Sequence, residues 1–339
     1  MKNTKSALLL SGSGGNISQE VAIIDQLIKT ERIQLNQKDT ILVASGTSAT
    51  TAVAINACFR KEHPCSWDNY YKSIFLETLE NDEVFMKVHP VQWSTHAMRN
   101  KLTMLLRTAG FSQISDLPFH TSLLISSTQR NKTTWIKSKS KKHENGDLID
   151  ILMASAALPV LFPPQVINSV YDLPLQIKEG TYAEGAHNGL FFNFRKQLKK
   201  IIAENYSIDE LFVLSPQRAI DPATNIPDKL SAMTFDEKTT LDNFMEQISL
   251  HEFLVFLNDL KQANHKHKFA RKISVTLPET GKIYPITDFA NQNSKYKMIT
   301  KWLDENPDKL CVELNEFCEN ITLIPSTIPV YLSLLSQTN

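Results

Sequence analysis

The sequence predicts an α/β fold with three layers, in which helices cover both faces of a mostly parallel central sheet. The first third of the chain alternates strand and helix patterns: an apolar run at 7–10, an Ile/Val helical repeat through 17–28, and a second apolar run at 41–44. This strand–helix–strand order favours parallel pairing of the two strands. Further short apolar strands are expected at 121–126, 133–136, 211–214 and 273–277.

Helical spacing of apolar residues continues along the rest of the chain. An Ala-rich helix should begin at Ser48, and further helices are expected at 147–157, 235–264 and 293–304. In the tail, the spacing of Leu310, Leu314 and Phe317 predicts one more helix. No linker-like composition precedes residue 305, so we expect one catalytic domain at 1–305 and a C-terminal extension at 306–339 that packs on it.

Composition excludes several classes of function. The chain has 339 residues, of which 42% are hydrophobic, so a sizeable core is available. Lys and Arg together number 36, as do Asp and Glu, so the net charge of +0 gives no bulk attraction to nucleic acid. The four cysteines are too few for a disulfide framework, and none are spaced closely enough for a metal site. We therefore expect no metal and no nucleic-acid partner.

The N-terminus carries Lys2 and Lys5 before an apolar run, which is the order found in signal peptides. That run covers only 7–10, too short for a signal core, and no stretch approaches the ~20 apolar residues of a membrane span. We expect a cytoplasmic or otherwise soluble protein. This expectation is compatible with transient contact at a membrane surface and with delivery to another cell by a signal-less route.

The most informative feature is a serine at a sharp turn between a buried strand and a helix. Ser48 sits in the run Gly46-Thr47-Ser48-Ala49-Thr50, where its hydroxyl can project from the chain and the helix N-terminus favours negative charge. The alternative for an isolated Ser here is a helix N-cap. A Gly-rich loop at 11–15 follows the first strand, and its backbone N–H groups can hold an anion. A nucleophile and an anion cradle on neighbouring strand ends indicate acyl transfer.

Four segments, taken in order and spacing, resemble the patatin-like phospholipases over roughly residues 6–305. They are Gly-Ser-Gly-Gly at 12–15, Gly-Thr-Ser-Ala-Thr at 46–50, Ala-Ser-Ala-Ala-Leu-Pro to Phe-Pro-Pro at 154–164, and Tyr-Ala-Glu-Gly-Ala-His-Asn at 182–188. The stretch at 154–164 is the most specific of the four. The Gly12-x-Gly14 start also occurs in dinucleotide-binding loops, but Ile17 stands where their third glycine is required.

The resemblance implies a patatin-like fold and a lipid acyl hydrolase that uses a Ser–Asp dyad without His or cofactor. Ser48 matches the nucleophile, and Glu184 matches the position of the dyad Asp. The remaining matched positions are the oxyanion loop, Ser13, Gly14 and Gly15, and the elbow, Gly46, Ala49 and Thr50. The implied substrate is an acyl lipid or phospholipid, and the resemblance specifies no protein partner.

Three positions depart from the family pattern. Thr50 replaces the second glycine of the elbow, Asn16 replaces a basic residue after the loop glycines, and Glu184 replaces Asp. Glu is one methylene longer than Asp, which adds roughly 1.5 Å of reach. These departures motivate a second hypothesis, a pseudoenzyme of the same fold that binds lipid or a protein partner.

Two further residues offer other bases for Ser48. A conventional α/β-hydrolase would need a Ser-Asp-His triad, although in that fold the nucleophile normally comes much later in the chain. His187 is the candidate histidine, though the patatin-like pattern treats it as a turn residue. Asp172 is a fallback carboxylate in a Tyr-Asp-Leu-Pro context typical of a loop.

Overall fold

The structure is a computed structural model. It describes residues 5–10, 12, 14–76, 95–129, 132–157, 162–167, 180–184, 208–214, 256–276 and 292–316. Within these ranges, no helix combines the length and apolar character that crossing a membrane requires.

The described strands form one sheet in the order β5-β6-β3-β2-β1-β7-β8-β9, with β4 also paired to β3. Its centre is parallel and consists of β1 (Ser6–Leu10), β2 (Thr40–Ala44), β3 (His120–Ser127), β7 (Ile208–Leu214) and β8 (Ala270–Thr276). The antiparallel additions are β4 (Lys132–Lys137), β5 (Gln165–Ile167), β6 (Gly180–Glu184) and β9 (Val312–Glu313). The mostly parallel sheet predicted from the sequence is confirmed.

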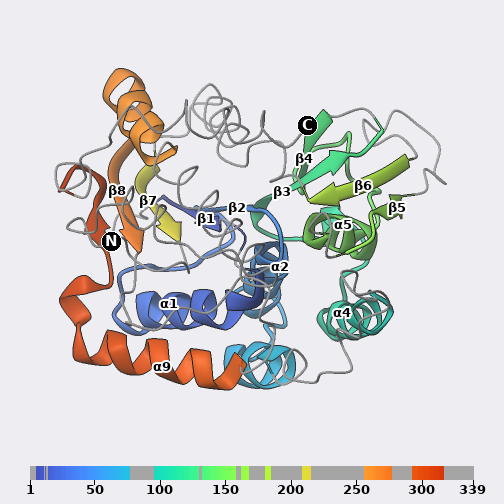
Figure 1. The fold of residues 1–339 in the computed structure, drawn as a ribbon, viewed down its shortest axis with the longest axis horizontal. Coiled ribbons are helices and arrows are strands. Elements are labelled where there is room, and N and C mark those ends of the chain that lie inside the picture. The colour runs from blue at the N-terminus through green and yellow to red at the C-terminus, as the bar shows by residue number, and fades with distance from the viewer. Residues whose placement is uncertain are drawn as a thin grey trace, which may run out of the picture.

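Both faces of the sheet are covered by helices. Successive strand residues point to opposite sides, so each strand contributes apolar side chains to both faces. Leu8 and Leu10 of β1 belong to one apolar cluster, and Ala7 and Leu9 belong to the other. The cluster on the first face includes residues of α1 (Ile17–Lys29), α2 (Ser48–Cys58) and α5 (Leu148–Ala156). It extends to α9 (Gln292–Glu305), which packs on α1, and to α4 (His96–Ala109), which packs on α5. The helical segment 256–267 packs on the second face, at the top left of Figure 1. The three-layer α/β/α arrangement is therefore confirmed.

Short helices connect these elements. They are the 3-10 turns η1 (Gly14–Asn16), η4 (Ile114–Asp116) and η6 (Pro307–Lys309), and the π-helix η2 (Trp67–Leu76). Helix α9 lies along α1 (Figure 1), where Gln26 and Lys29 both donate to Asp304. This contact pairs the C-terminal ends of the two helices, and the start of α9 lies beside the Gly-rich loop, where Gln292 donates to the Gly15 carbonyl.

The tail differs from its prediction at Val312–Glu313, which form β9 rather than helix. The β-branched Val312 pairs with Val275 on β8, so an open sheet edge outweighs the helical spacing of the leucines. Residues 314–316 are helical, so this part of the prediction is confirmed; Leu314 is buried in the core, and Phe317 lies outside the described residues. The domain boundary at residue 305 stays a prediction.

Candidate active site

Two loops meet at the carboxyl ends of β1 and β2. The two strands are parallel, and Leu10 pairs with Ala44 at their ends. Beyond that pair, Ser45 N–H donates to the Leu10 carbonyl at 3.2 Å, and Thr47 Oγ1 donates to the Gly14 carbonyl at 3.3 Å. The Gly-rich loop and the serine turn therefore lie side by side at the edge where ligands bind in parallel sheets.

The serine turn has the geometry of a strand-to-helix elbow. Gly46 has a φ of +60°, a left-handed conformation that glycine adopts without steric cost. Helix α2 starts at Ser48, and its N-cap is Thr47. The N-cap alternative for Ser48 is therefore wrong. The hydroxyl of Ser48 does not cap the helix but points to other partners.

The Ser48 hydroxyl is fully buried and bonded on two sides. It donates to Glu20 Oε2 at 2.5 Å, and it accepts the Gly12 N–H at 3.0 Å. A bond this short between a hydroxyl and a carboxyl is typical of a charge-assisted hydrogen bond. The structure thus brings together Ser48, a loop N–H and a carboxyl group. The carboxyl group belongs to α1, and sequence reasoning missed it.

The sequence did carry a signal for Glu20. The residue lies on the apolar stripe of α1, three positions after Ile17 and four before Ile24, and a carboxylate on such a stripe is unusual. Gly12 was also missed as the direct donor, since the resemblance points to Ser13, Gly14 and Gly15. Of these three, Ser13 lies outside the described residues.

Glu20 is held in an environment that resists its ionisation. Burial raises its pKa from an ordinary value of 4.5 to about 7, and the Ser48 and Thr51 hydroxyls offset part of this rise. Its second oxygen, Oε1, makes no hydrogen bond within the described part of the chain. The Thr51 hydroxyl lies 2.7 Å from the hydroxyl of Tyr71, which is also buried. The result is a carboxyl group that titrates near neutral pH.

The glycines of the candidate oxyanion loop are fixed from α9. The Gly15 carbonyl accepts two hydrogen bonds, from Gln292 Nε2 at 2.8 Å and from Lys295 Nζ at 2.9 Å. Gly14 has a φ of +52°, which again favours glycine. A carbonyl held by two donors on α9 stays turned toward that helix. We call the two side chains of α9 on Gly15 the α9 clamp.

The α9 clamp brings a lysine to the loop in which Asn16 replaces the basic residue of the family pattern. Asn16 is the N-cap of α1, is buried, and accepts a bond from Gln19 at 3.4 Å. It supplies no positive charge to the loop. Lys295 is fully buried, and its ammonium group reaches the loop from a helix 280 residues away in sequence.

The segment at 154–157 supports the elbow through packing. Asp147 caps α5 by accepting the N–H groups of Ile149 and Asp150. At the other end of α5, Ser155 is fully buried, and its Oγ donates to the Gly46 carbonyl at 3.4 Å. The small residues of this segment therefore let α5 approach the elbow closely, which explains why the motif is built from Ala and Ser.

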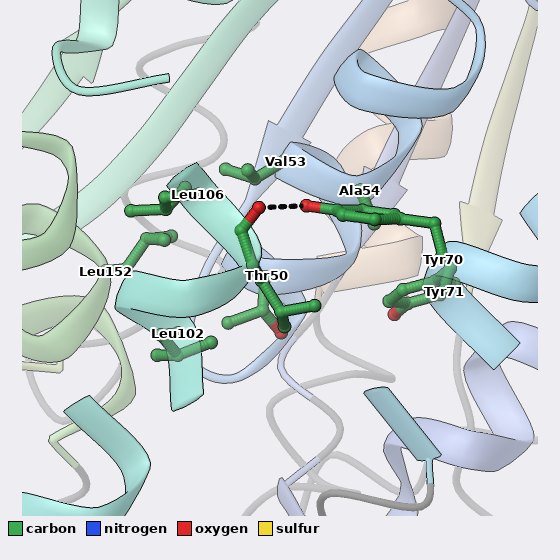
Figure 2. Close-up of a pocket in the computed structure, with 9 residues that line it drawn as sticks. Thr50, Val53, Ala54, Tyr70, Tyr71, Leu102, Leu106 and Leu152 are labelled. Atoms are coloured by element: carbon green, nitrogen blue, oxygen red, sulfur yellow. Dashed lines mark hydrogen bonds between the residues drawn. The ribbon is translucent and has the colours of Figure 1, made fainter. Parts of the chain in front are cut away.

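Thr50 is accommodated at a small cavity. Its hydroxyl donates to the Thr47 carbonyl at 2.6 Å, and its side chain lines a cavity of about 20 Å³ together with Val53, Leu152 and other apolar residues (Figure 2). Tyr70 on the opposite wall donates to the Leu105 carbonyl at 2.7 Å. Ligand sites for small molecules usually enclose ~300–1,000 Å³, so this cavity is too small for an acyl chain. It gives the extra bulk of Thr50 a place in the packing.

Glu184 is placed only by strand register. Its backbone pairs with Ile125 of β3, and β4 occupies one edge of β3 over Ser122–Ser127. Both β2 and β6 pair with residues of β3 that also pair with β4, so β2 and β6 lie one after the other along the opposite edge of β3. Since β2 ends with Ala44 beside Leu123, Glu184 stands two strand positions beyond the end of β2, where the elbow begins. A contact between Ser48 and Glu184 stays a prediction.

Two other candidates cannot be placed relative to Ser48. Asp172 and His187 lie outside the described residues. Within the described ranges, no group of three His, Cys, Asp or Glu side chains could hold a metal ion.

Comparison with known proteins identifies the family of this chain. A family model described as patatin-like phospholipase matches residues 31–211, more than half of the chain, and it includes the elbow, α5 and β6. No match is found among curated proteins. Among solved structures, the crystal structure of VipD from Legionella pneumophila is similar with a TM-score of 0.31 and 10% sequence identity, covering 89% of this chain and 67% of that one. The family match displaces the α/β-hydrolase alternative, and the chain belongs to the patatin-like phospholipase family.

Proposed function

We propose that this protein is a lipid acyl hydrolase of the phospholipase A or lipase type, with Ser48 as its nucleophile. Family membership supports acyl-lipid hydrolysis at the level of the family. The observation that carries the assignment is the environment of the Ser48 hydroxyl at the start of α2. This hydroxyl accepts the Gly12 N–H and donates to the Glu20 carboxyl group of α1. Nucleophilic serines require both a proton acceptor and nearby N–H donors for the oxyanion.

In the proposed reaction, Ser48 Oγ attacks the carbonyl carbon of a fatty acyl ester while a carboxylate accepts its proton. Glu184, at the position of the family Asp, acts as the general base. The N–H groups of Gly14 and Gly15, with Ser13, stabilise the oxyanion, and the ester C–O bond then breaks as the alcohol leaves with a proton. Water attacks the acyl-Ser48 intermediate and releases the fatty acid. Removing one oxyanion donor typically costs about 10²–10³ in rate.

The substrate and the domain arrangement belong to the same proposal. Neutral net charge and the family favour an acyl lipid or phospholipid, reached by transient contact with a lipid surface. Residues 1–305 would form the catalytic domain and 306–339 an extension packed on it. The pairing of β9 with β8 and the burial of Leu314 support that packing.

A second candidate is a pseudoenzyme that binds lipid or a protein partner. The observation that favours it is the burial of Ser48, whose hydroxyl is turned inward to a buried carboxyl group. The departures at Asn16, Thr50 and Glu184 point the same way.

Fatty acid release from mixed phosphatidylcholine–phosphatidylglycerol micelles tests the proposal directly. The full chain should release fatty acid, and Ser48→Ala should lower the rate at least about 10³-fold. The matched control is Ser45→Ala, because Ser45 is buried in the same turn and its Oγ has no hydrogen-bond partner among the described residues. Equal rates for the full chain and Ser48→Ala would reject hydrolysis at Ser48, as would the absence of both lipolysis and labelling by a fluorophosphonate probe.

A further inference from the structure

The contact between Ser48 and Glu20 is not explained by the family pattern. That pattern supplies one carboxylate, at position 184, whereas the Ser48 hydroxyl donates to a carboxyl group of α1 at 2.5 Å. Both side chains are fully buried, so water competes with neither partner. The proton that Ser48 must lose during attack therefore already points at a proton acceptor.

A purely structural role accounts poorly for this residue. Burying an ionisable carboxyl group costs free energy, and a Gln at position 20 would accept the same hydrogen bond from Ser48 without carrying a charge. Buried polar atoms are normally all hydrogen-bonded, yet Oε1 of Glu20 makes no such bond within the described residues. Costly groups of this kind concentrate at functional sites.

We propose that Glu20 is the catalytic carboxylate that takes the Ser48 proton when Ser48 is acylated. The inference rests on the proposed function. It divides the general-base role that the proposed function gives to Glu184, and it assigns the acylation step to Glu20. As the bond from Ser48 Oγ to the acyl carbon forms, the Ser48 proton passes to Glu20 Oε2. When the ester C–O bond breaks, that proton passes to the leaving alkoxide and Glu20 returns to its carboxylate form. The role of Glu184 is then confined to the steps after acylation.

The surroundings of Glu20 suit a base that works near neutral pH. Burial is the largest cause of its raised pKa of about 7. Among the described residues, the titratable or polar groups that face it include the Ser48 and Thr51 hydroxyls from α2 and the Tyr71 phenol from η2. Burial raises the pKa of Tyr71 well above its ordinary value, so this phenol stays neutral. A base with a pKa near the working pH is the most efficient general base.

Labelling of Ser48 by a fluorophosphonate probe isolates the acylation step, because Oγ attacks phosphorus and fluoride leaves. Rates should be measured from pH 5.5 to 8.5 for the full chain, Glu20→Gln and Glu184→Gln. We expect the rate for the full chain to rise with a midpoint near pH 7. Glu20→Gln should be labelled at least 100-fold more slowly at pH 8 and lose the rise, whereas Glu184→Gln should stay within about fivefold of the full chain.

A matched control and the opposite outcomes make the test decisive. Asp25→Asn changes a carboxylate of the same helix that instead contacts Lys72 and Tyr296, and it should leave labelling unchanged. If Glu20→Gln is labelled as fast as the full chain with the same pH profile, Glu20 is not the base. If that variant fails to fold, a flat pH profile for the full chain would equally exclude Glu20 as the base. If the full chain is not labelled at Ser48 at all, the proposed function fails as well.

Discussion

The two sides of Ser48 are built from different parts of the chain and contact different atoms of the elbow. One side, formed by α5 and β6, lies inside the family match at 31–211 and contains two of the four motif segments, at 154–164 and 182–188. Its described contact with the elbow is made to the Gly46 carbonyl, by Ser155. The other side, formed by the Gly-rich loop, α1 and α9, lies outside that match. Its contacts reach the Ser48 hydroxyl itself.

This difference indicates a division of labour. The side formed by α5 and β6 shapes the turn that presents Ser48, whereas the other side supplies the hydrogen-bond partners of its hydroxyl. Changes on the first side should therefore lower stability with little effect on the reactivity of Ser48, whereas changes on the second side should slow the reaction of Ser48 itself. Four substitutions test this division, in order of decreasing effect.

Leu152→Ala should give the largest loss of stability. Leu152 of α5 is buried and lines the small cavity beside Thr50, so truncation enlarges an existing void. Leu→Ala changes of this kind cost ~2–5 kcal/mol. Urea unfolding measures the loss, and the labelling rate of Ser48 per folded molecule should change less than about threefold. Leu152→Met conserves volume and should cost less than ~1.5 kcal/mol. A stable but unreactive Leu152→Ala protein would break the division.

Glu20→Gln should change stability by up to about 3 kcal/mol, and in the favourable direction. The folded pKa of about 7 lies above the ordinary 4.5, so the folded state holds this proton more tightly than the unfolded chain does. The associated stabilisation is complete below pH 4.5 and is lost as the pH rises to about 7. At roughly 1.4 kcal/mol per pKa unit, the loss between these two pKa values is slightly above 3 kcal/mol.

Glu20→Gln removes this titration, so the variant should be the more stable protein at pH 8. Its advantage over the unsubstituted chain should shrink on going from pH 8 to pH 5. Unfolding free energies at both pH values measure the difference. If the variant is less stable at pH 8, Glu20 is a stabilising core residue, and the interpretation of its burial is wrong.

Lys295→Met should slow labelling of Ser48 about tenfold and lower stability less than Leu152→Ala does. The α9 clamp keeps the Gly15 carbonyl turned to α9, and a carbonyl oxygen that swung toward the site would repel the developing oxyanion. Gln292 still holds the carbonyl in the variant, which limits the loss. Met replaces the amino group with an apolar side chain of similar length, and the lost hydrogen bond to the Gly15 carbonyl should cost about 1–3 kcal/mol. Lys297→Met, at an exposed position of α9, is the control.

The sequence predicts local elements of this molecule well and the contacts between distant segments poorly. Local patterns located β1, β2, the start of α2 and the parallel sheet, because periodicity and turn residues act over short stretches. The partners of the site come from distant segments: Glu20 reaches Ser48 across 28 residues and Lys295 reaches Gly15 across 280. No local pattern records such contacts. Val312–Glu313 was mistaken for helix for the same reason, since its partner strand is β8.

Ser155→Ala should have the smallest effect, although Ser155 belongs to the most specific motif in the sequence. Its bond to the Gly46 carbonyl is long, at 3.4 Å, and that carbonyl also accepts the Ala49 N–H at 3.1 Å. Losing the hydroxyl therefore leaves no acceptor unsatisfied and should cost about 1 kcal/mol or less. Labelling of Ser48 should change by less than about threefold, whereas Ser155→Leu should overpack the contact between α5 and the elbow and destabilise the fold by ~1–3 kcal/mol. If Ser155→Ala instead abolishes labelling while the protein stays folded, the side formed by α5 and β6 takes part in the chemistry, and the two sides of Ser48 are not divided as proposed.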